Sequence, residues 1–272
     1  MSHTGAGIST VKLYRGQLRK YGHLDFNNPR EVMKKLSEAT NTRGRPLSPS
    51  YIKGIISAIV WKIRQDDKDN PILDDYRHII AHIRGKIERE SRTNKKVSGH
   101  LPDWEDIVRK RDEEYRAGRL KNHLILSLYT YTPPRRILDY LMLKIVRTPN
   151  EANDVTYNYY ITSKKSFVYN VYKTAKKYKQ QIIKAPPTLH KIITNYVTTN
   201  GIKNGELLLG FRNYLQLNYL LKKLLGCGVD NIRHSYINHA YKNFNIPTNE
   251  FMSDLAEKMG HSVETNLMYR KF

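Results

Sequence analysis

The sequence predicts a mainly α-helical protein with a small three-stranded β insert, arranged as two domains. Apolar residues recur at helical spacing through most of the 272 residues, and an alternation typical of strands is confined to residues 155–184. A polar stretch with little periodicity, residues 91–102, separates two helical regions and is typical of a linker. We therefore expect a helical domain at 1–90 and a second domain at 103–272.

Four helices are expected in the first domain, because four signals for a helix start each precede a run of apolar residues at helical spacing. The third signal is the strongest, since an N-cap serine is followed by proline in the first turn. The expected starts are Ser9 or Thr10, Pro29, Ser48 with Pro49, and Asp74.

The second domain is expected to be helical around a β insert. Asp103 caps a helix that runs through Arg116, and an apolar helix at 124–131 is stopped by two prolines at 133–134. Three short strands follow within 155–184, with turns at 163–166 and 175–179. After residue 187 the chain is expected to be helical to its end, with one helix at 214–225.

The charge predicts a polyanionic partner. The formal net charge is +22, with 20 Lys and Arg against 10 Asp and Glu in residues 1–100, and 27 against 15 in the rest. Both halves are basic, which favours a protein that grips DNA from two sides over a domain with a basic tail. The single cysteine, Cys227, excludes an internal disulfide and a Cys-rich zinc site.

No leader segment and no membrane-spanning run are recognised, so we expect a soluble, intracellular protein. Gly-rich phosphate loops and dense carboxylate clusters are not recognised either. The sequence thus agrees with a chemistry that uses no metal, no cofactor and no small-molecule substrate.

Two segments in the middle of the chain contain residues suited to phosphate chemistry. Arg135 and Arg136 follow the two prolines at the start of a helix, and Asp139 is placed to brace Arg136 from the same face. Lys173 ends the second strand and can donate a proton to a leaving oxygen. The turn after it is rich in lysine, with Lys176, Lys177 and Lys179. An ordinary surface ion pair and nonspecific phosphate contacts are the alternative interpretations.

Two further segments lie near the C-terminus. Arg233, in the run Asp230-Asn-Ile-Arg-His234, offers a second guanidinium after a glycine-rich turn, although a surface arginine is an equal alternative. Gly260 ends a helix, His261 lies in the turn, and Ser262 caps a last helix that presents Tyr269. A tyrosine attacks phosphorus only when its proton is removed and the phosphate charge is neutralised, which guanidinium and imidazole groups provide.

The order of these segments resembles the catalytic half of the tyrosine recombinase (phage integrase) family. The first family motif, T-G-x-R-x-x-E-L, is similar to Thr132-Pro-Pro-Arg-Arg-Ile-Leu-Asp139, and the second, H-x-x-R-H-[ST], to Asp230-Asn-Ile-Arg-His-Ser235. The third, L-G-H-S…T…Y, is similar to Met259-Gly-His-Ser262 with Thr265 and Tyr269. The hairpin lysine of the family corresponds to Lys173 in Tyr172-Lys-Thr174.

The resemblance covers residues 103–272, and more loosely the first hundred residues, which resemble the helical core-binding domain of the family. It implies a site-specific recombinase or integrase that cleaves DNA through a 3′-phosphotyrosyl bond and a Holliday junction. The wording of the first motif looks like integrases of eukaryotic DNA viruses and virophages, which would place the protein in the host nucleus or a viral factory. The catalytic residues it implies are Arg136, Lys173, Asp230, Arg233, His261 and the nucleophile Tyr269.

The implied partner is double-stranded DNA, bound by a homotetramer that is a monomer when free. Further DNA contacts are expected from Arg135, from the lysines at 176, 177 and 179, and from Arg43, Arg45 and Lys53 in the first domain. With three residues behind it, Tyr269 is expected to be mobile until DNA or a partner subunit fixes it.

Four departures from the family pattern keep alternatives open, one of which is the spacing of eight residues from His261 to Tyr269, slightly shorter than usual. Arg135 competes with Arg136 as the catalytic arginine of the first motif, and Asp230 stands where the family has histidine. The chain also stops three residues after Tyr269, whereas many relatives continue. A type IB topoisomerase, which uses the same chemistry as a monomer, and a non-catalytic DNA-binding relative are the other functions to weigh.

Overall fold

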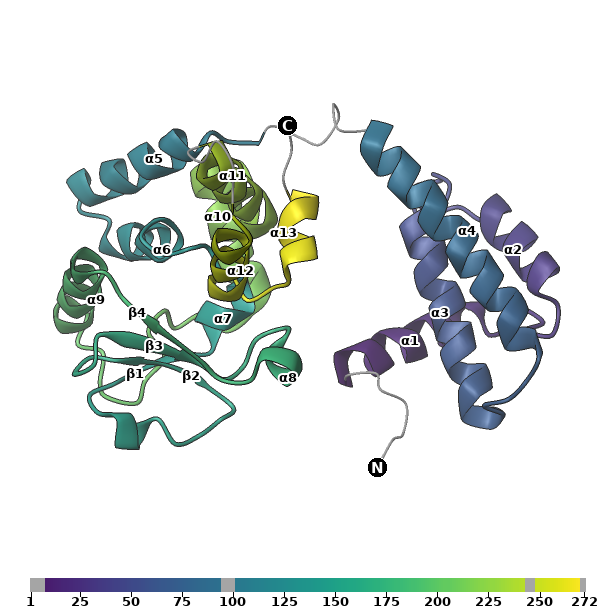
Figure 1. Ribbon diagram of the computed structural model, residues 1–272, viewed down its shortest axis with the longest axis horizontal. Coiled ribbons are helices and arrows are strands. Elements are labelled where there is room, and N and C mark those ends of the chain that lie inside the picture. The colour runs from purple at the N-terminus through teal and green to yellow at the C-terminus, as the bar shows by residue number, and fades with distance from the viewer. Residues whose placement is uncertain (1–7, 94–100, 243–247, 270–272) are drawn as a thin grey trace. The chain divides into compact units, whose positions relative to one another are not determined.

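The computed structural model describes residues 8–93, 101–242 and 248–269 (Figure 1). The chain divides into two compact units, residues 1–98 (the N-terminal unit) and 99–272 (the C-terminal unit). No helix of the described segments is long and apolar enough to cross a bilayer.

The N-terminal unit is built from helices around one apolar core. Isoleucines of the third helix and Tyr76 of the fourth fill its centre and are fully buried. The Ser48 hydroxyl accepts a hydrogen bond from the Tyr51 N–H (3.2 Å), which confirms the predicted N-cap. The helices are α1 (Ile8–Tyr21), α2 (Pro29–Glu38), α3 (Pro49–Asp66) and α4 (Ile72–Thr93).

Three predicted boundaries in this unit were wrong. α4 begins two residues before Asp74, because the Asn70 side chain accepts a hydrogen bond from the Ile72 N–H (3.1 Å) and starts the helix earlier. Ser9 and Thr10 likewise lie inside α1, which begins at Ile8. α4 continues to Thr93, so the first residues of the predicted linker 91–102 are helical.

The C-terminal unit combines helices with a sheet that lies at one end of it (Figure 1). Its main core joins apolar residues of most of these elements, and Leu124, Ile137 and Ile232 are completely buried there. The longer helices are α5 (Trp104–Arg116), α6 (Leu120–Thr130), α9 (Pro187–Thr199), α10 (Tyr214–Leu225), α11 (Val229–Lys242) and α12 (Asn249–Lys258). The shorter ones are α7 (Ile137–Leu141), the 3-10 helix at Pro149–Glu151, α8 (Ala175–Tyr178) and α13 (Val263–Tyr269).

The sheet has four strands in the order β1-β2-β3-β4, where three were predicted. The strands are β1 (Leu143–Val146), β2 (Asn158–Ile161), β3 (Ser166–Tyr169) and β4 (Gln181–Lys184). β1 is the strand that the prediction missed, because four mostly apolar residues directly after a helix do not distinguish a strand from a helical turn. It pairs in parallel with β2, whereas β2, β3 and β4 pair antiparallel.

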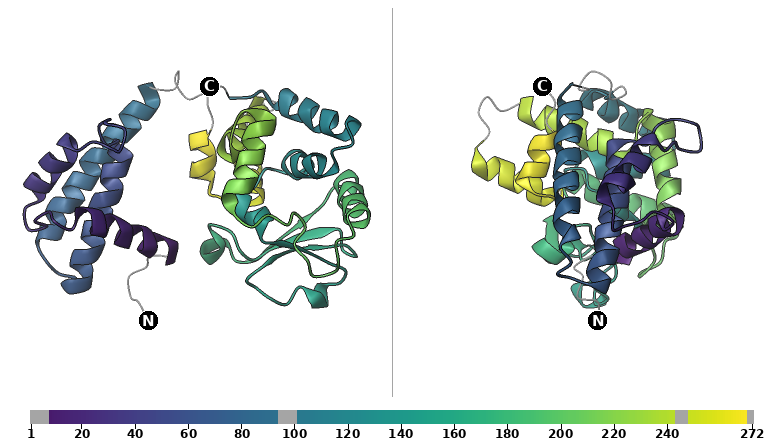
Figure 2. Two further views of the ribbon diagram at one scale, coloured as in Figure 1. Left: turned by 180° about the vertical axis from the view of Figure 1, so that it is seen from behind. Right: turned by 90° about the vertical axis from the view of Figure 1, so that its right-hand side faces the viewer.

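The end of the chain packs back onto the helices that precede it. α13 lies alongside α11 and α12 (Figures 1 and 2). The Ser262 hydroxyl accepts a hydrogen bond from the Thr265 N–H (3.3 Å), so Ser262 caps α13 as predicted. The helix α13, which ends at Tyr269, therefore packs against the helix that carries Arg233.

Candidate active site

Three arginines from distant parts of the chain converge on one four-residue turn, 258–261, which joins α12 to α13. The last carbonyl groups of a helix lack partners within it and carry partial negative charge, so they are good acceptors for guanidinium groups. The hydrogen bonds run from Arg135 Nη1 to the Lys258 carbonyl (2.9 Å), from Arg136 Nη1 to the Gly260 carbonyl (2.8 Å), and from Arg233 Nη2 to His261 Nδ1 (3.0 Å).

Arg135 is the buried member of the adjacent arginine pair. Its side chain is completely enclosed, its Nε donates to the Asp139 carboxylate (2.8 Å), and its guanidinium lies 3.9 Å from the centre of the Tyr169 ring. The Tyr172 ring lies on the guanidinium as well, at 5.0 Å. A surface contact with DNA, as predicted for Arg135, does not fit this burial.

Asp139 pairs with Arg135, and the prediction that it braces Arg136 was wrong. The prediction assumed that Arg136 is helical, so that a residue three positions later shares its face. Arg136 is instead the extended N-cap of α7, and the helix begins at Ile137. Burial raises the pKa of Asp139, and the nearby guanidinium groups, Arg135 first, act against that rise. The pair is therefore costly to desolvate and costly to break.

Arg136 remains partly exposed, unlike its neighbour. One of its N–H groups is used by the Gly260 carbonyl, and a guanidinium carries five. α7, which follows, has only five residues, so its N-terminus adds little to anion binding, contrary to the prediction of a phosphate-binding helix start. What Arg136 offers a ligand is its own side chain.

His261 is a buried, neutral imidazole. Burial and, to a smaller extent, the charges of Arg233 and Arg136 lower its pKa to about 3, while a hydrogen bond with Asn266 acts in the opposite direction. A guanidinium can only donate, so Nδ1 of His261 accepts the bond from Arg233. The proton of the neutral ring is therefore on Nε2, which makes Nε2 a hydrogen-bond donor.

Gly260 is required at the centre of the turn for two reasons. Its φ is +65°, a backbone conformation that residues with a side chain rarely adopt. A Cβ at this position would lie 2.7 Å from Arg135 Nη2 and 3.4 Å from the ring of Tyr172. The glycine of the Gly-His motif thus lets the turn approach the buried guanidinium.

Lys173 lies in the loop 170–174 (the Lys173 loop) between β3 and α8, and its side chain is exposed. The residues on either side are anchored, since Tyr172 packs on Arg135 and the Thr174 hydroxyl donates to the Gly260 carbonyl (2.9 Å). Lys173 is therefore held beside the turn that gathers the arginines. The predicted turn 175–179 contains the helix α8, with exposed lysines at 176, 177 and 179.

For the remaining predicted residues, the structure describes the position in the fold but no hydrogen bond to the turn 258–261. Asp230 is exposed in the first turn of α11, one turn before Arg233. The side chain of Tyr269 lies outside the described residues, so its expected mobility stays a prediction. In the N-terminal unit, Arg43 and Arg45 are exposed in the loop before α3, and Lys53 is half-buried on α3.

Sequence reasoning missed the two tyrosines that cover Arg135. Tyr169 and Tyr172 lie three residues apart at the end of β3, and such a pair is indistinguishable from core aromatics until the arginine is located. Asn158, which is fully buried beside the Lys173 loop, was also missed. A polar residue at the start of an aromatic strand was the only available signal.

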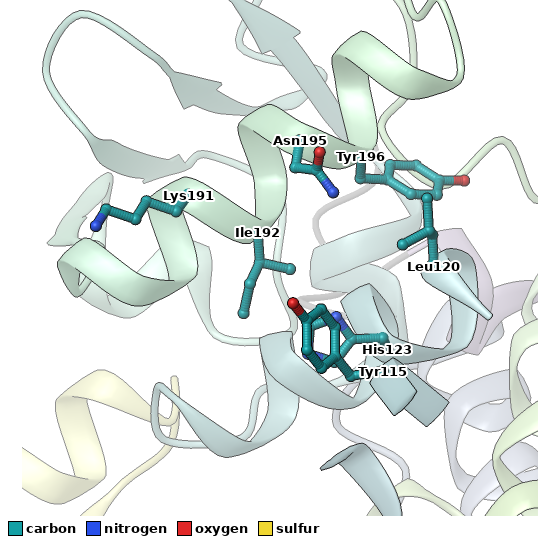
Figure 3. A pocket seen from close by; sticks show the side chains of 7 residues that line it. All are labelled: Tyr115, Leu120, His123, Lys191, Ile192, Asn195 and Tyr196. Carbon is teal, nitrogen blue, oxygen red and sulfur yellow. The ribbon is translucent and has the colours of Figure 1, made fainter. Parts of the chain in front are cut away.

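A separate pocket of about 200 Å³ lies between α5, α6 and α9 (Figure 3). The rings of Tyr115 and His123 lie 4.9 Å apart at its wall, and burial lowers the pKa of His123. None of the predicted site residues lines it. Among the described residues, no group of three or more His, Cys, Asp or Glu is arranged to hold a metal ion.

No protein-family model matches the sequence, and no curated protein matches it. Among solved structures, an XerA recombinase is similar to this chain with 16% identity and a TM-score of 0.42, over 98% of this chain and 88% of its own. The integrase of the transposon Tn1549, in complex with transposon right-end DNA, is similar with 12% identity and a TM-score of 0.39, over 97% of this chain and 95% of its own.

Proposed function

We propose that this protein is a tyrosine-type DNA strand transferase, a site-specific recombinase or integrase. The observation that carries the proposal is the convergence of three guanidinium groups and one neutral imidazole on the turn before α13, the helix that ends at Tyr269. This combination suits a pentavalent phosphate transition state, which needs donors aimed at the oxygens where charge develops.

The reaction begins with the attack of the Tyr269 hydroxyl oxygen on the scissile phosphorus. A bond forms between that oxygen and phosphorus, and the bond from phosphorus to the 5′ oxygen breaks. The leaving 5′ oxygen takes a proton from the Lys173 ammonium group, and the phenolic proton of Tyr269 passes to solvent. The 3′-phosphotyrosyl bond keeps the energy of the broken bond, so a second DNA strand with a 5′ hydroxyl reverses the step and rejoins.

The two adjacent arginines have different roles in this proposal. Arg136 is the phosphate ligand, because it is partly exposed and acts more strongly on the pKa of His261 than Arg135 does. Arg135 is a buried cation that supports the turn. Arg233 and His261 are as buried as Arg135 in the DNA-free chain, so they complete the set of donors only once DNA binding opens the site to the phosphate. Loss of one such donor is expected to slow cleavage by about 10²–10³-fold.

Asp230 has no step in this mechanism. Its side chain is exposed, and a carboxylate beside the phosphate would work against the charge neutralisation that the arginines provide. The family histidine that it replaces is a phosphate donor in the resemblance. In this proposal the donors of Arg136, Arg233 and His261 neutralise the phosphate charge without a donor at position 230.

The two units divide the work on DNA. We assign DNA binding to the N-terminal unit, through Arg43, Arg45 and Lys53, and catalysis to the C-terminal unit, with the lysines at 176, 177 and 179 as phosphate contacts. The net charge of +22 supports an extended DNA interface. A homotetramer on two duplexes, working through a Holliday junction, is the assembly that strand exchange between duplexes requires, and integration of a viral or mobile element is the biological role.

A covalent-capture experiment tests the proposal. The full-length protein is incubated with a pool of labelled duplexes that have a randomised 30-bp centre and scattered nicks, so that cleavage near a nick releases a short fragment and traps the enzyme. Adducts that survive denaturation are isolated, sequenced, and digested for mass spectrometry of the tyrosine that carries the nucleotide. The expected result is an adduct on Tyr269, which Tyr269→Phe abolishes while the affinity for DNA is retained.

The matched control is Tyr219→Phe, since Tyr219 is an exposed tyrosine on α10 of the same unit. It is expected to leave adduct formation unchanged. An adduct on another residue, or no adduct from any duplex in the pool, would overturn the proposal. Relaxation of supercoils without joining of separate duplexes would assign the chemistry to a topoisomerase instead.

A further inference from the structure

Asn158, the first residue of β2, is fully buried and uses every hydrogen-bonding group of its side chain. Nδ2 donates to the carbonyl oxygens of Asp139 (2.8 Å) and Val171 (2.9 Å), and Oδ1 accepts from the backbone N–H groups of Asn170 (2.8 Å) and Val171 (2.7 Å). A primary amide has two donors and accepts readily from two more groups. Each of them is satisfied here, as burial requires.

These four hydrogen bonds join two elements of the candidate site. The groups at residues 170 and 171 belong to the Lys173 loop, and the Asp139 carbonyl belongs to α7. Asp139 is also the residue whose carboxylate pairs with Arg135. Asn158 therefore connects the backbone in front of Lys173 to the residue that holds the buried arginine.

The other side of the Lys173 loop is closed by two further bonds. The Tyr172 hydroxyl donates to the Lys179 carbonyl (2.6 Å), and the Thr174 hydroxyl donates to the Gly260 carbonyl (2.9 Å). The backbone of Lys173 thus lies between anchored residues, while its exposed side chain has room to reach a ligand. The anchor at Asn158 is the only one of these that is completely buried.

We propose that Asn158 is a positioning residue, which fixes the Lys173 loop so that the ammonium group of Lys173 reaches the leaving 5′ oxygen. This inference rests on the proposed function, because it takes Lys173 as the proton donor. Asn158 touches neither DNA nor the reacting atoms and acts through its bonds to the backbone at 170–171 and at Asp139.

The side chain at this position cannot be exchanged without losing the anchor. Aspartate keeps the shape but loses both donors, and it would place carboxylate oxygens against the carbonyls of Asp139 and Val171. Alanine leaves two N–H groups and two carbonyls of the backbone without a partner. A displacement of about 1 Å in a catalytic group can cost about 10²-fold in rate, so release of the loop is expected to slow cleavage by that order.

The test compares two leaving groups on a duplex captured from the randomised pool. One substrate has the natural 5′ oxygen at the scissile phosphate, and the other has sulfur at that position. An alkyl thiol ionises near pH 8.5, far below an alcohol, so the sulfur leaves as a thiolate and needs no proton from Lys173. Single-turnover cleavage rates are measured for wild type, Asn158→Ala, Lys173→Ala and control variants.

The expected result is that Asn158→Ala cleaves the oxygen substrate about 10²-fold more slowly than wild type, and the sulfur substrate within about fivefold of it. Lys173→Ala is expected to show the same pattern with a larger defect. The control Asn204→Ala removes an asparagine that ties a different loop, through the Arg147 N–H (2.9 Å) and Glu151 (3.1 Å), and should leave both rates unchanged.

A second variant covers the case in which Asn158→Ala does not fold. Asn170→Ala removes side-chain bonds on the outside of the same loop, to the Tyr157 carbonyl (2.8 Å) and Gln180 (2.7 Å), and leaves the core intact. It is expected to slow the oxygen substrate by about tenfold and to be rescued by sulfur.

Three outcomes overturn the inference, and they are distinguishable. If Asn158→Ala slows cleavage of the oxygen and sulfur substrates equally, Asn158 supports the general stability of the unit or the position of the arginines, and not the proton donor. Wild-type rates in Asn158→Ala, or in Asn170→Ala where the first variant is unfolded, show that the loop needs no anchor. Absence of cleavage by the wild-type protein removes the proposed function, and this inference with it.

Discussion

Replacement of Gly260 by alanine tests the idea that the turn 258–261 is packed directly on the Arg135 guanidinium. The new Cβ would lie 2.7 Å from Nη2 and 3.2 Å from Cζ of Arg135. The end of an arginine normally moves aside at little cost. Here it is held by the Asp139 carboxylate, by the Lys258 carbonyl and by the ring of Tyr169.

The expected loss of stability has two parts. The left-handed backbone, with φ of +65°, costs alanine about 1 kcal/mol relative to glycine. Overpacking against a group that is held in place adds about 1–3 kcal/mol. We therefore expect Gly260→Ala to lower the free energy of unfolding of the C-terminal unit by about 3 kcal/mol.

Gly226→Ala is the matched control. Gly226 caps α10 in the same unit with φ of +70°, and no atom lies within 4 Å of the position where its Cβ would be. Gly226→Ala has the same backbone penalty as Gly260→Ala but no steric contact, so we expect it to lower the free energy of unfolding by about 1 kcal/mol. The difference between the two variants measures the steric part alone.

The unfolding of the C-terminal unit can be followed by fluorescence. The chain has two tryptophans, Trp61 in the N-terminal unit and Trp104, which is buried in the C-terminal unit. In a Trp61→Phe background, urea titrations report on Trp104 only. Combination of Gly260→Ala with Arg135→Ala closes a double-mutant cycle, in which the steric part should disappear. If the two glycine variants differ by less than about 0.5 kcal/mol, the close approach does not constrain the turn.

Two further predictions concern the same cluster. Asp139→Asn leaves the Arg135 charge buried without its partner, so the free energy of unfolding of the C-terminal unit, measured by urea titration, should fall by about 3–5 kcal/mol. The control is Asp106→Asn, which breaks an exposed ion pair with Arg109 and should change that free energy by less than about 1 kcal/mol. Similar losses in the two variants would refute the importance of burial. His261 has a folded pKa of about 3, so below pH 6.5 only the unfolded state takes up its proton, and stability falls as the pH is lowered. Wild type should lose on the order of 2 kcal/mol more than His261→Gln between pH 6.5 and 5, and parallel pH profiles for the two proteins would contradict this.

The helices of this protein could be predicted where the sequence marks their ends. Ser48 with Pro49 starts α3, and Ser262 starts α13, because these residues satisfy backbone groups that the helix itself leaves unpaired. α10 has the predicted bounds, 214–225, because a left-handed glycine follows it. Local chemistry is sufficient for such boundaries.

The strand β1 and the partner of Asp139 could not be predicted, for related reasons. β1 is a strand because β2 is available to pair with it, and that pairing is not local. Asp139 reaches Arg135 because α7 begins one residue later than the spacing rule assumed. A shift of one residue in a helix start changes which side chains share a face.

The positions of the site residues were partly accessible from sequence. The order of Arg136, Arg233 and His261 suggested a common site, and hydrogen bonds bring these three to one turn. The environment that supports them was not accessible, because Tyr169 and Asn158 act through contacts with residues far away in the sequence or with backbone atoms. Their residue types do not reveal such roles.

The turn 258–261 also bears on when this site exists during the life of the polypeptide. The bonds from Arg135 to Lys258 and from Arg136 to Gly260 span 123 and 124 residues. A ribosome adds about 5–20 residues per second, so the arginines leave it many seconds before their acceptors are made. A nascent chain can thus fold its basic N-terminal helices while the arginine cluster at this turn is still unassembled.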